Sequence, residues 1–339
     1  MTPLSAADAV SPAIQRTKTF LFAPFKWGTF LKLSLVAVLT EGLSGNSNYS
    51  GGGGHGSRNG PEVYSPFHLS PEWIAAIVAA LLLAMLLGFL VFYLITRLRF
   101  AFFHCLIHNT KEIGPGWQLY RAQAGRFFRL SVVVGLCFVV VLVLVALPFA
   151  AGFWRLWSES RAGGQLDIGL FLSLFLPLIP IILLLVLTAF AADLILRDLM
   201  MPHFALDNAT AGEAWAAVWT RIKREKGPFV LYAVLRVVLP VAATIAVVIV
   251  FIIPVLIFGL AVAGIEAGIH SAIEGAPGIL AVGGMVLEGL VGAVAFAIAL
   301  LAVLCVGGPL STAIRQYALV FYGGRYPALG DILYPPAAA

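Results

Sequence analysis

Two charged residues that lie within apolar sequence are the first candidates for chemistry. Glu288 belongs to the apolar run 278–307, and Arg236 belongs to the run 229–262. A charge inside a membrane needs a partner, so such a residue indicates a functional site by default. On a helix, Glu288 shares one face with glycines and alanines, which favours close approach by a second helix. We predict a buried Glu288–Arg236 pair or a shared polar network. The alternative is that each side chain reaches its own membrane surface.

Two histidines have a spacing that can serve metal ligation. His104 and His108 are four residues apart and therefore share a helix face. Metal or haem binding would need further ligands, but the sequence has no HExxH motif and no other cluster of His or Cys. The three cysteines lie in or beside apolar runs without CxxC spacing. We predict a pair of interfacial histidines and neither a metal nor a cofactor.

Motifs of common enzyme classes are absent from the sequence. It contains no Gly-x-Ser-x-Gly, no Ser-His-Asp pattern, no dinucleotide fingerprint and no carboxylates paired at catalytic spacing. The segment 44–70 is rich in glycine, but a phosphate loop also needs Gly-Lys-Ser/Thr leading into a helix. We predict that 44–70 is a flexible external loop, and we expect no catalytic residue.

The composition determines which elements can hold these residues. Of 339 residues, 61% are hydrophobic and only 11% are charged, whereas a soluble domain has roughly 25% charged residues. Long apolar runs predict spanning helices. These runs cover about 27–43, 73–96, 130–152, 168–192, 229–262 and 278–307. The first is short and contains Lys32 and Glu41. We predict an all-α polytopic bundle of about six transmembrane helices, forming a single membrane domain over 1–339.

The basic residues indicate the orientation of these helices. Segments 1–32, 97–129, 193–226 and 308–339 hold 17 of the 21 Lys and Arg, and the opposite loops hold three. This asymmetry predicts that the basic segments are cytoplasmic. Both termini are then cytoplasmic, and the number of spans is even. We predict a bacterial cytoplasmic membrane protein, and the net charge of +5 does not suggest nucleic acid.

A threefold repeat is visible at the start of alternate spans. The three openings are Gly28-Thr29-Phe30, Gly125-Arg126-Phe127 and Gly227-Pro228-Phe229, and the aromatics eight residues before the glycines are Phe20, Trp117 and Trp219. The stretch 103–110 also parallels 203–210, each ending in a helix-capping segment. The predicted repeat units are 12–110, 111–210 and 211–325. Each is a hairpin preceded by a surface helix.

The predicted surface helices are basic, amphipathic and cytoplasmic. A tryptophan at headgroup depth and neighbouring cations are typical of helices that lie along a membrane. A glycine is expected to end each surface helix before the next span. The candidate lipid-headgroup contacts are Trp117, Arg121, Arg126, Trp219, Lys223, Arg224 and Lys226.

This layout resembles a known membrane module. The repeat pattern, and the stretch from Asp198 to Lys226 with Pro202 and Ala214-Trp215, is similar to the membrane domain of some bacterial glycerophosphodiester phosphodiesterases. It also resembles several bacterial membrane families of unknown function. The resemblance covers most of the chain, but its motifs are unspecific. It implies a membrane-embedded module and transfers no catalytic residue, because the phosphodiesterase domain is a separate soluble barrel.

The leading hypothesis is a non-enzymatic integral membrane protein with a scaffold, lipid-organising or accessory-subunit role. Its expected partners are phospholipids, preferably anionic, and other membrane subunits. A transporter or channel is the alternative, and it would use a polar site around Glu288 and Arg236. A lipid-modifying enzyme is the third hypothesis. It would require His104, His108, His203, Asp198 and Asp207 to converge.

Overall fold

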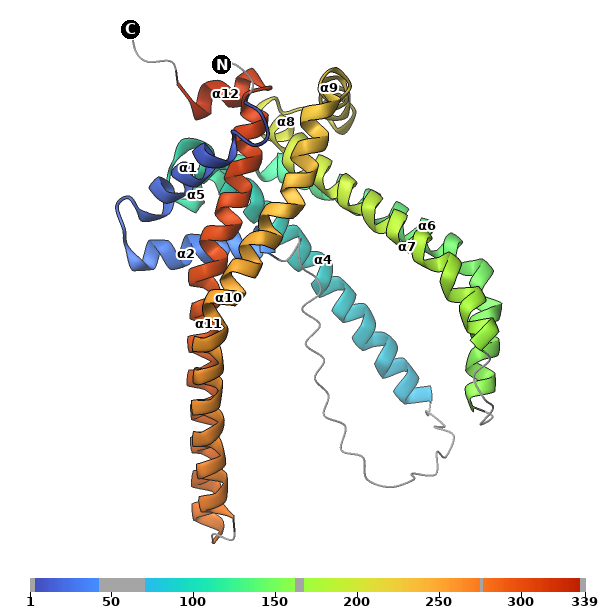
Figure 1. Ribbon diagram of the computed structural model, residues 1–339, viewed down its shortest axis with the longest axis vertical. Helices are drawn as coiled ribbons and strands as arrows, with labels where there is room; N and C mark the ends of the chain where they lie inside the picture. The colour runs from blue at the N-terminus through green and yellow to red at the C-terminus, as the bar shows by residue number, and fades with distance from the viewer. Residues whose placement is uncertain (1–3, 43–70, 162–167, 275–276, 336–339) are drawn as a thin grey trace. The chain divides into compact units, whose positions relative to one another are not determined.

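The computed structural model describes residues 4–42, 71–161, 168–274 and 277–335. Every regular element in these ranges is a helix, which confirms the predicted all-α class (Figure 1). The predicted external loop 44–70 lies outside the described residues. The elements are α1 (Val10–Phe22), α2 (Trp27–Ala37), η1 (Val38–Gly42), α4 (Pro71–His108), α5 (Ile113–Leu119), α6 (Arg121–Arg161), α7 (Ile168–Leu194), η2 (Ile195–Met200), α8 (Met201–Leu206), α9 (Ala211–Arg224), α10 (Lys226–Ile273), α11 (Gly278–Gly323) and α12 (Pro327–Leu333).

Among the described residues, five helices are long and apolar enough to cross a membrane, which indicates an integral membrane protein. They occupy Glu72–His108, Arg121–Ser158, Phe171–Leu206, Lys226–Ile273 and Gly278–Gly323. Each matches a predicted span and is longer than it. The first predicted span, 27–43, is not among them. Its described part consists of α2, with 11 residues, and the π-helix η1, with five.

Charged residues mark the ends of the exposed apolar stretches. α10 has 48 residues and is therefore about 72 Å long, more than twice the hydrocarbon thickness of a bilayer. Its uncharged stretch begins after Arg236 and ends before Glu266. In α11 the uncharged stretch lies between Glu288 and Arg315. Most large apolar side chains in these stretches are exposed, as expected where lipid replaces water as the solvent.

The chain forms two compact units, and the first contains segments from three parts of the sequence. This unit comprises the described residues of Met1–Ala9, Gln118–Leu235 and Ala318–Ala339. α6 and α7 pack as a hairpin, and α8 contacts α6, α9 and α12. Its core includes an edge-to-face contact between Phe127 and Phe204. We call it unit 1.

The second unit, unit 2, comprises Val10–Trp117 and Arg236–Tyr317. α2 packs against α1 and α4, and η1 also contacts α4. The side chains that join α1 to the end of α4 are of two kinds. Phe20 and Phe102 meet edge to face, and Arg16 donates to the carbonyl oxygen of Leu106 at 3.5 Å.

The repeat glycines do not end the surface helices. Gly28 lies in α2, Gly125 lies in α6 and Gly227 lies in α10. For the second and third repeats the breaks fall five and two residues earlier, at Tyr120 and Glu225. The expectation that each glycine breaks a helix was therefore wrong. A lone glycine costs a helix only about 1 kcal/mol, too little to end it.

Two asparagines in the left-handed region reverse the chain after long helices. Asn109 has φ 52° and follows α4, and Asn208 has φ 53° and follows α8. Asparagine tolerates this conformation and commonly ends helices. The backbone N–H of Thr110 then donates a hydrogen bond to the carbonyl oxygen of Cys105 at 3.0 Å. The correspondence between Asn109 and Asn208 shifts the predicted alignment of 103–110 with 203–210 by one residue.

Gly116 allows α5 to pack closely on α4. A Cβ atom at this position would lie 2.8 Å from the His104 Cβ and 3.0 Å from the Ala101 Cα. The second atom belongs to the backbone and cannot rotate away. We predict that Gly116→Ala lowers the free energy of unfolding by about 1–3 kcal/mol through overpacking. The measurement is the thermal unfolding of the detergent-solubilised protein.

Gly114 supplies the matched control, because it lies in the same helix and a Cβ atom there would have no neighbouring atom within 4 Å. Gly114→Ala should leave stability unchanged or raise it slightly, through better helix propensity. Equal unfolding temperatures for the two variants would contradict the close packing of α5 on α4.

Candidate functional site

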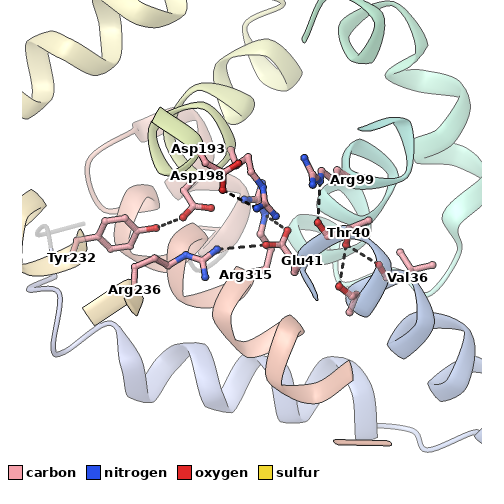
Figure 2. A network of polar contacts seen from close by, with 11 residues as sticks. Val36, Thr40, Glu41, Arg99, Asp193, Asp198, Tyr232, Arg236 and Arg315 are labelled. Atoms are coloured by element: carbon pink, nitrogen blue, oxygen red, sulfur yellow. Dashed lines mark hydrogen bonds and ion pairs between the residues drawn. The ribbon is translucent and has the colours of Figure 1, made fainter. Parts of the chain in front are cut away.

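A carboxylate at the end of η1 faces two arginines of unit 2 (Figure 2). The Oε2 atom of Glu41 lies 3.5 Å from Nη2 of Arg236, and its Oε1 atom lies 3.8 Å from Nε of Arg315. The exposed side-chain fractions are 6% for Glu41, 14% for Arg236 and 2% for Arg315. Charges this deeply buried require counter-charges, and the two arginines share the one that Glu41 supplies.

The π-turn of η1 and small residues of α11 position this cluster. Thr40 donates its hydroxyl to the carbonyl oxygen of Val36 at 2.7 Å, and its own carbonyl oxygen accepts from Nε of Arg99 at 3.0 Å. π-turns recur at functional sites. A Cβ atom at Gly308 would collide with the Ser34 side chain and backbone, so only glycine lets α11 approach α2 this closely.

The structure does not bring Arg236 and Glu288 together. Glu288 instead lies 3.3 Å from the Nδ1 atom of His270, near the other end of the α10–α11 hairpin. Arg236 shares Glu41 with Arg315, and the stretch of α11 between Arg315 and Glu288 spans about 40 Å at 1.5 Å per residue. The two charges lie at opposite ends of an apolar stretch. A transport path through a joint Glu288–Arg236 site therefore loses its geometric basis.

In unit 1, a buried histidine bridges three polar groups. The Nδ1 atom of His203 lies 2.8 Å from Oδ2 of Asp207, and its Nε2 atom lies 2.8 Å from the Tyr322 hydroxyl and 3.4 Å from Nη1 of Arg221. An arginine can only donate, so Nε2 must be the acceptor. His203 is then neutral in this arrangement, with its proton on Nδ1 and directed at Asp207.

The pKa of the Asp207 carboxyl depends on its contacts with His203 and Tyr326. Burial raises the pKa of Asp207, but interactions with the Tyr326 hydroxyl and His203 outweigh burial and leave the pKa below its ordinary value. Burial and the nearby carboxylate raise the pKa of Tyr326. Because the folded pKa of Asp207 is depressed, its contribution to stability is complete above its ordinary pKa. That contribution is lost as the pH falls through the depressed value.

Arg325 connects three segments of unit 1. Its Nε atom donates to Oε2 of Glu225 at 2.7 Å, and its Nη1 atom donates to the carbonyl oxygens of Leu4 and Phe321, each at 3.0 Å. Its guanidinium also lies 4.1 Å from the centroid of the Phe321 ring. The sequence alone identifies Arg325 only as a loop charge, because its partners are distant in the sequence.

α9 places tryptophans and cations on its exposed sides. Its start at Thr210 forms a capping box with Glu213, as the predicted capping segment at 203–210 required. Ala214 and Val218 are buried, whereas the Trp215 and Trp219 rings are exposed and stack 5.7 Å apart. The last turn contains Arg221, Lys223 and Arg224.

The other predicted headgroup contacts have mixed environments. Trp117 is half-buried beneath Arg97, whose guanidinium lies 4.4 Å from its ring centroid. Arg126 donates to the backbone and the side chain of Asn208, which gives it a structural role within unit 1. Arg121 and Lys226 are both exposed, in the first turns of α6 and α10.

The groups expected of a lipid-modifying enzyme form separate arrangements. His203 pairs with Asp207, Asp198 accepts from the Tyr232 hydroxyl at 2.8 Å (Figure 2), and His104 and His108 stack with ring centroids 4.6 Å apart. Within the described residues, no three His, Cys, Asp or Glu side chains are grouped to hold a metal ion.

The Glu41 cluster and the His270–Glu288 pair allow a matched comparison. We predict that Glu41→Gln lowers the free energy of unfolding by about 3–5 kcal/mol, because it removes a buried counter-charge. Glu288→Gln makes the same chemical change at a pair whose histidine is 72% exposed. Its expected effect is about 0–1 kcal/mol. Thermal unfolding in detergent measures both, and equal losses would contradict the counter-charge role of Glu41.

The comparisons with known proteins identify a family without assigning an activity. No curated protein and no solved structure matches the chain. The resemblance to the membrane domain of glycerophosphodiester phosphodiesterases therefore stays a prediction. One family, described as a family of unknown function (DUF7544), matches residues 4–332. The chain belongs to this family, DUF7544.

Proposed function

We propose that the protein is a non-enzymatic membrane protein that binds anionic phospholipid on its cytoplasmic face and serves there as a scaffold or accessory subunit. The observation that carries this proposal is the exposed side of α9. Trp215 and Trp219 lie beside cations on a helix whose other side is buried against η2 and α8. Tryptophan prefers headgroup depth, and cations attract anionic lipid.

The charges of α9 and the start of α10 are sufficient for a measurable preference. A basic residue near an anionic leaflet contributes about 1 kcal/mol. Lys223, Arg224 and Lys226 all lie at or near the surface, and the Lys223 ammonium lies 5.4 Å from the Trp219 ring centroid. Three such residues would strengthen association with anionic lipid by about 3 kcal/mol, which is on the order of a hundredfold.

We also propose an even number of crossings in a bacterial cytoplasmic membrane, and a contact within unit 1 supports the even number. Five crossings would separate the two ends of the sequence by a bilayer about 30 Å thick. Arg325, however, donates to the carbonyl oxygen of Leu4. An even number of crossings, namely six if the predicted span 27–43 also crosses, would resolve this difference. It would place both ends on the basic, cytoplasmic side.

Local geometry also supports the proposed three-hairpin repeat. His104 and His203 each lie five residues before a left-handed asparagine, Asn109 and Asn208. The helix that follows each turn buries a small residue six or seven positions later, Gly116 in α5 and Ala214 in α9. α12 likewise buries Gly330, seven residues after α11 ends at Gly323.

The π-helix η2 accounts for a difference in spacing between the repeats. Arg99 precedes its left-handed asparagine by ten residues, and Arg197 precedes its asparagine by eleven. A π-turn accommodates one additional residue in a helix. Arg99 and Arg197, which is in η2, are therefore equivalent in this proposal.

Reporters fused to the two ends of the chain test the crossing number. We predict that reporters at the N- and C-terminal ends are both active only in the cytoplasm. A cysteine introduced into 44–70 should react with a membrane-impermeant reagent added outside intact cells. Reporters active on opposite sides would contradict six crossings.

Lipid titration of the purified protein tests the proposed function. We predict that phosphatidylglycerol binds more strongly than phosphatidylcholine, as counted by native mass spectrometry. Substituting Lys223, Arg224 and Lys226 by glutamine should reduce this preference by about a hundredfold, at about 1 kcal/mol per charge.

Arg155→Gln is the control. Arg155 is exposed and lies near the carboxyl-terminal end of α6, on the side of the membrane that is predicted to be external. The substitution should leave the preference for phosphatidylglycerol unchanged. Equal binding of the two lipids by the unsubstituted protein would remove the proposed role.

A further inference from the structure

α9 carries a groove beside its tryptophan pair. It is open, has a volume of about 470 Å³, and is lined by Ala216, Ala217, Thr220, Arg221 and Arg224. We propose that this groove binds the phosphate-monoester head group of phosphatidic acid. The proposal rests on the anionic-lipid role proposed above and adds a chemical preference to it.

Helix periodicity separates the groove from the tryptophans. Residues four apart form rows along a helix. One row contains Trp215, Trp219 and Lys223, and the next contains Ala216, Thr220 and Arg224. Lys223 accordingly lies over the Trp219 ring, whereas Arg224 lines the groove. Two adjacent residues with the same charge thus belong to different surfaces.

Arg221 is held in place before any ligand arrives. Its Nε atom donates to the carbonyl oxygen of Arg325 at 3.3 Å, and its Nη1 atom donates to the carbonyl oxygen of Ala217 at 3.0 Å and approaches His203. Its guanidinium lies 5.3 Å from the centroid of the Tyr326 ring. These contacts use Nε and Nη1. An arginine already fixed loses little further freedom when it binds a phosphate through Nη2.

The remaining groups favour a monoester over a diester. Arg224 adds a second guanidinium, and paired guanidiniums suit a phosphate that carries between one and two negative charges. Thr220 already donates its hydroxyl hydrogen to the carbonyl oxygen of Ala216 at 2.7 Å, so its oxygen can only accept. A singly protonated monoester has a P–OH group to donate, and a diester has none. The small side chains of Ala216 and Ala217 leave room for the phosphate.

The test compares the binding of two lipids to the full chain, purified in neutral detergent. Phosphatidic acid and phosphatidylglycerol are titrated separately, and bound lipid is counted by native mass spectrometry. Phosphatidic acid should bind about tenfold more strongly, as expected for one additional charge-assisted hydrogen bond. Arg224→Gln should abolish this difference in binding, whereas Lys223→Gln should weaken the binding of both lipids by the same factor. Size-exclusion chromatography verifies that each variant is folded.

Two further variants separate shape and hydrogen bonding from charge. Ala216→Leu fills the groove without changing any charge, and Thr220→Val removes the acceptor. Each should lower binding of phosphatidic acid and leave phosphatidylglycerol unchanged.

Equal effects of Arg224→Gln and Lys223→Gln on both lipids would overturn the groove proposal. So would complete displacement of phosphatidic acid by an equimolar amount of inorganic phosphate, because the site would then serve a soluble anion. A protein that still prefers phosphatidylglycerol to phosphatidylcholine in either case retains the proposed function. If the unsubstituted protein bound neither phosphatidic acid nor phosphatidylglycerol more strongly than phosphatidylcholine, the groove proposal and the proposed function would both be overturned.

Discussion

The arginines at the ends of the long apolar helices need negative partners within the protein, and Arg236 and Arg315 share the single carboxylate of Glu41. Lipid offers a guanidinium no counter-charge in its hydrocarbon region. The short π-helix that carries Glu41 therefore has to lie beside α10 and α11. Gly308 permits this, because α11 approaches α2 where a side chain would collide with Ser34. The arrangement of several helices in unit 2 thus follows from one buried carboxylate.

Elements that depend on local sequence were predictable. Five of the six predicted spans correspond to helices long enough to cross a membrane, because an uninterrupted apolar run specifies such a helix by itself. The cap at Thr210 was predictable for the same reason, since its partner Glu213 is three residues away. The exposed tryptophans of α9 also follow from helix periodicity.

Contacts between distant residues were not predictable in the same way. Arg236 and Glu288 were the visible charges in long apolar runs, but the structure places Glu41, from the short first run, beside Arg236. Apolar periodicity indicates that a charge needs a partner and does not specify which one. The sequence signal for this partner was the presence of Glu41 itself in an apolar segment. Arg325 was likewise missed, because its hydrogen bonds reach Leu4 and Glu225.

Unit 1 contains residues from the beginning, the middle and the end of the sequence, and this has a consequence for biosynthesis. The ribosome makes Leu4 long before Arg325, whose guanidinium holds the Leu4 carbonyl oxygen and lies 321 residues later in the sequence. Unit 2 closes earlier, because its last segment ends at Tyr317. A nascent chain released before Arg325 would thus retain its membrane anchors while its amino-terminal segment stayed undocked. Quality-control proteases could recognise such an incomplete product by that segment.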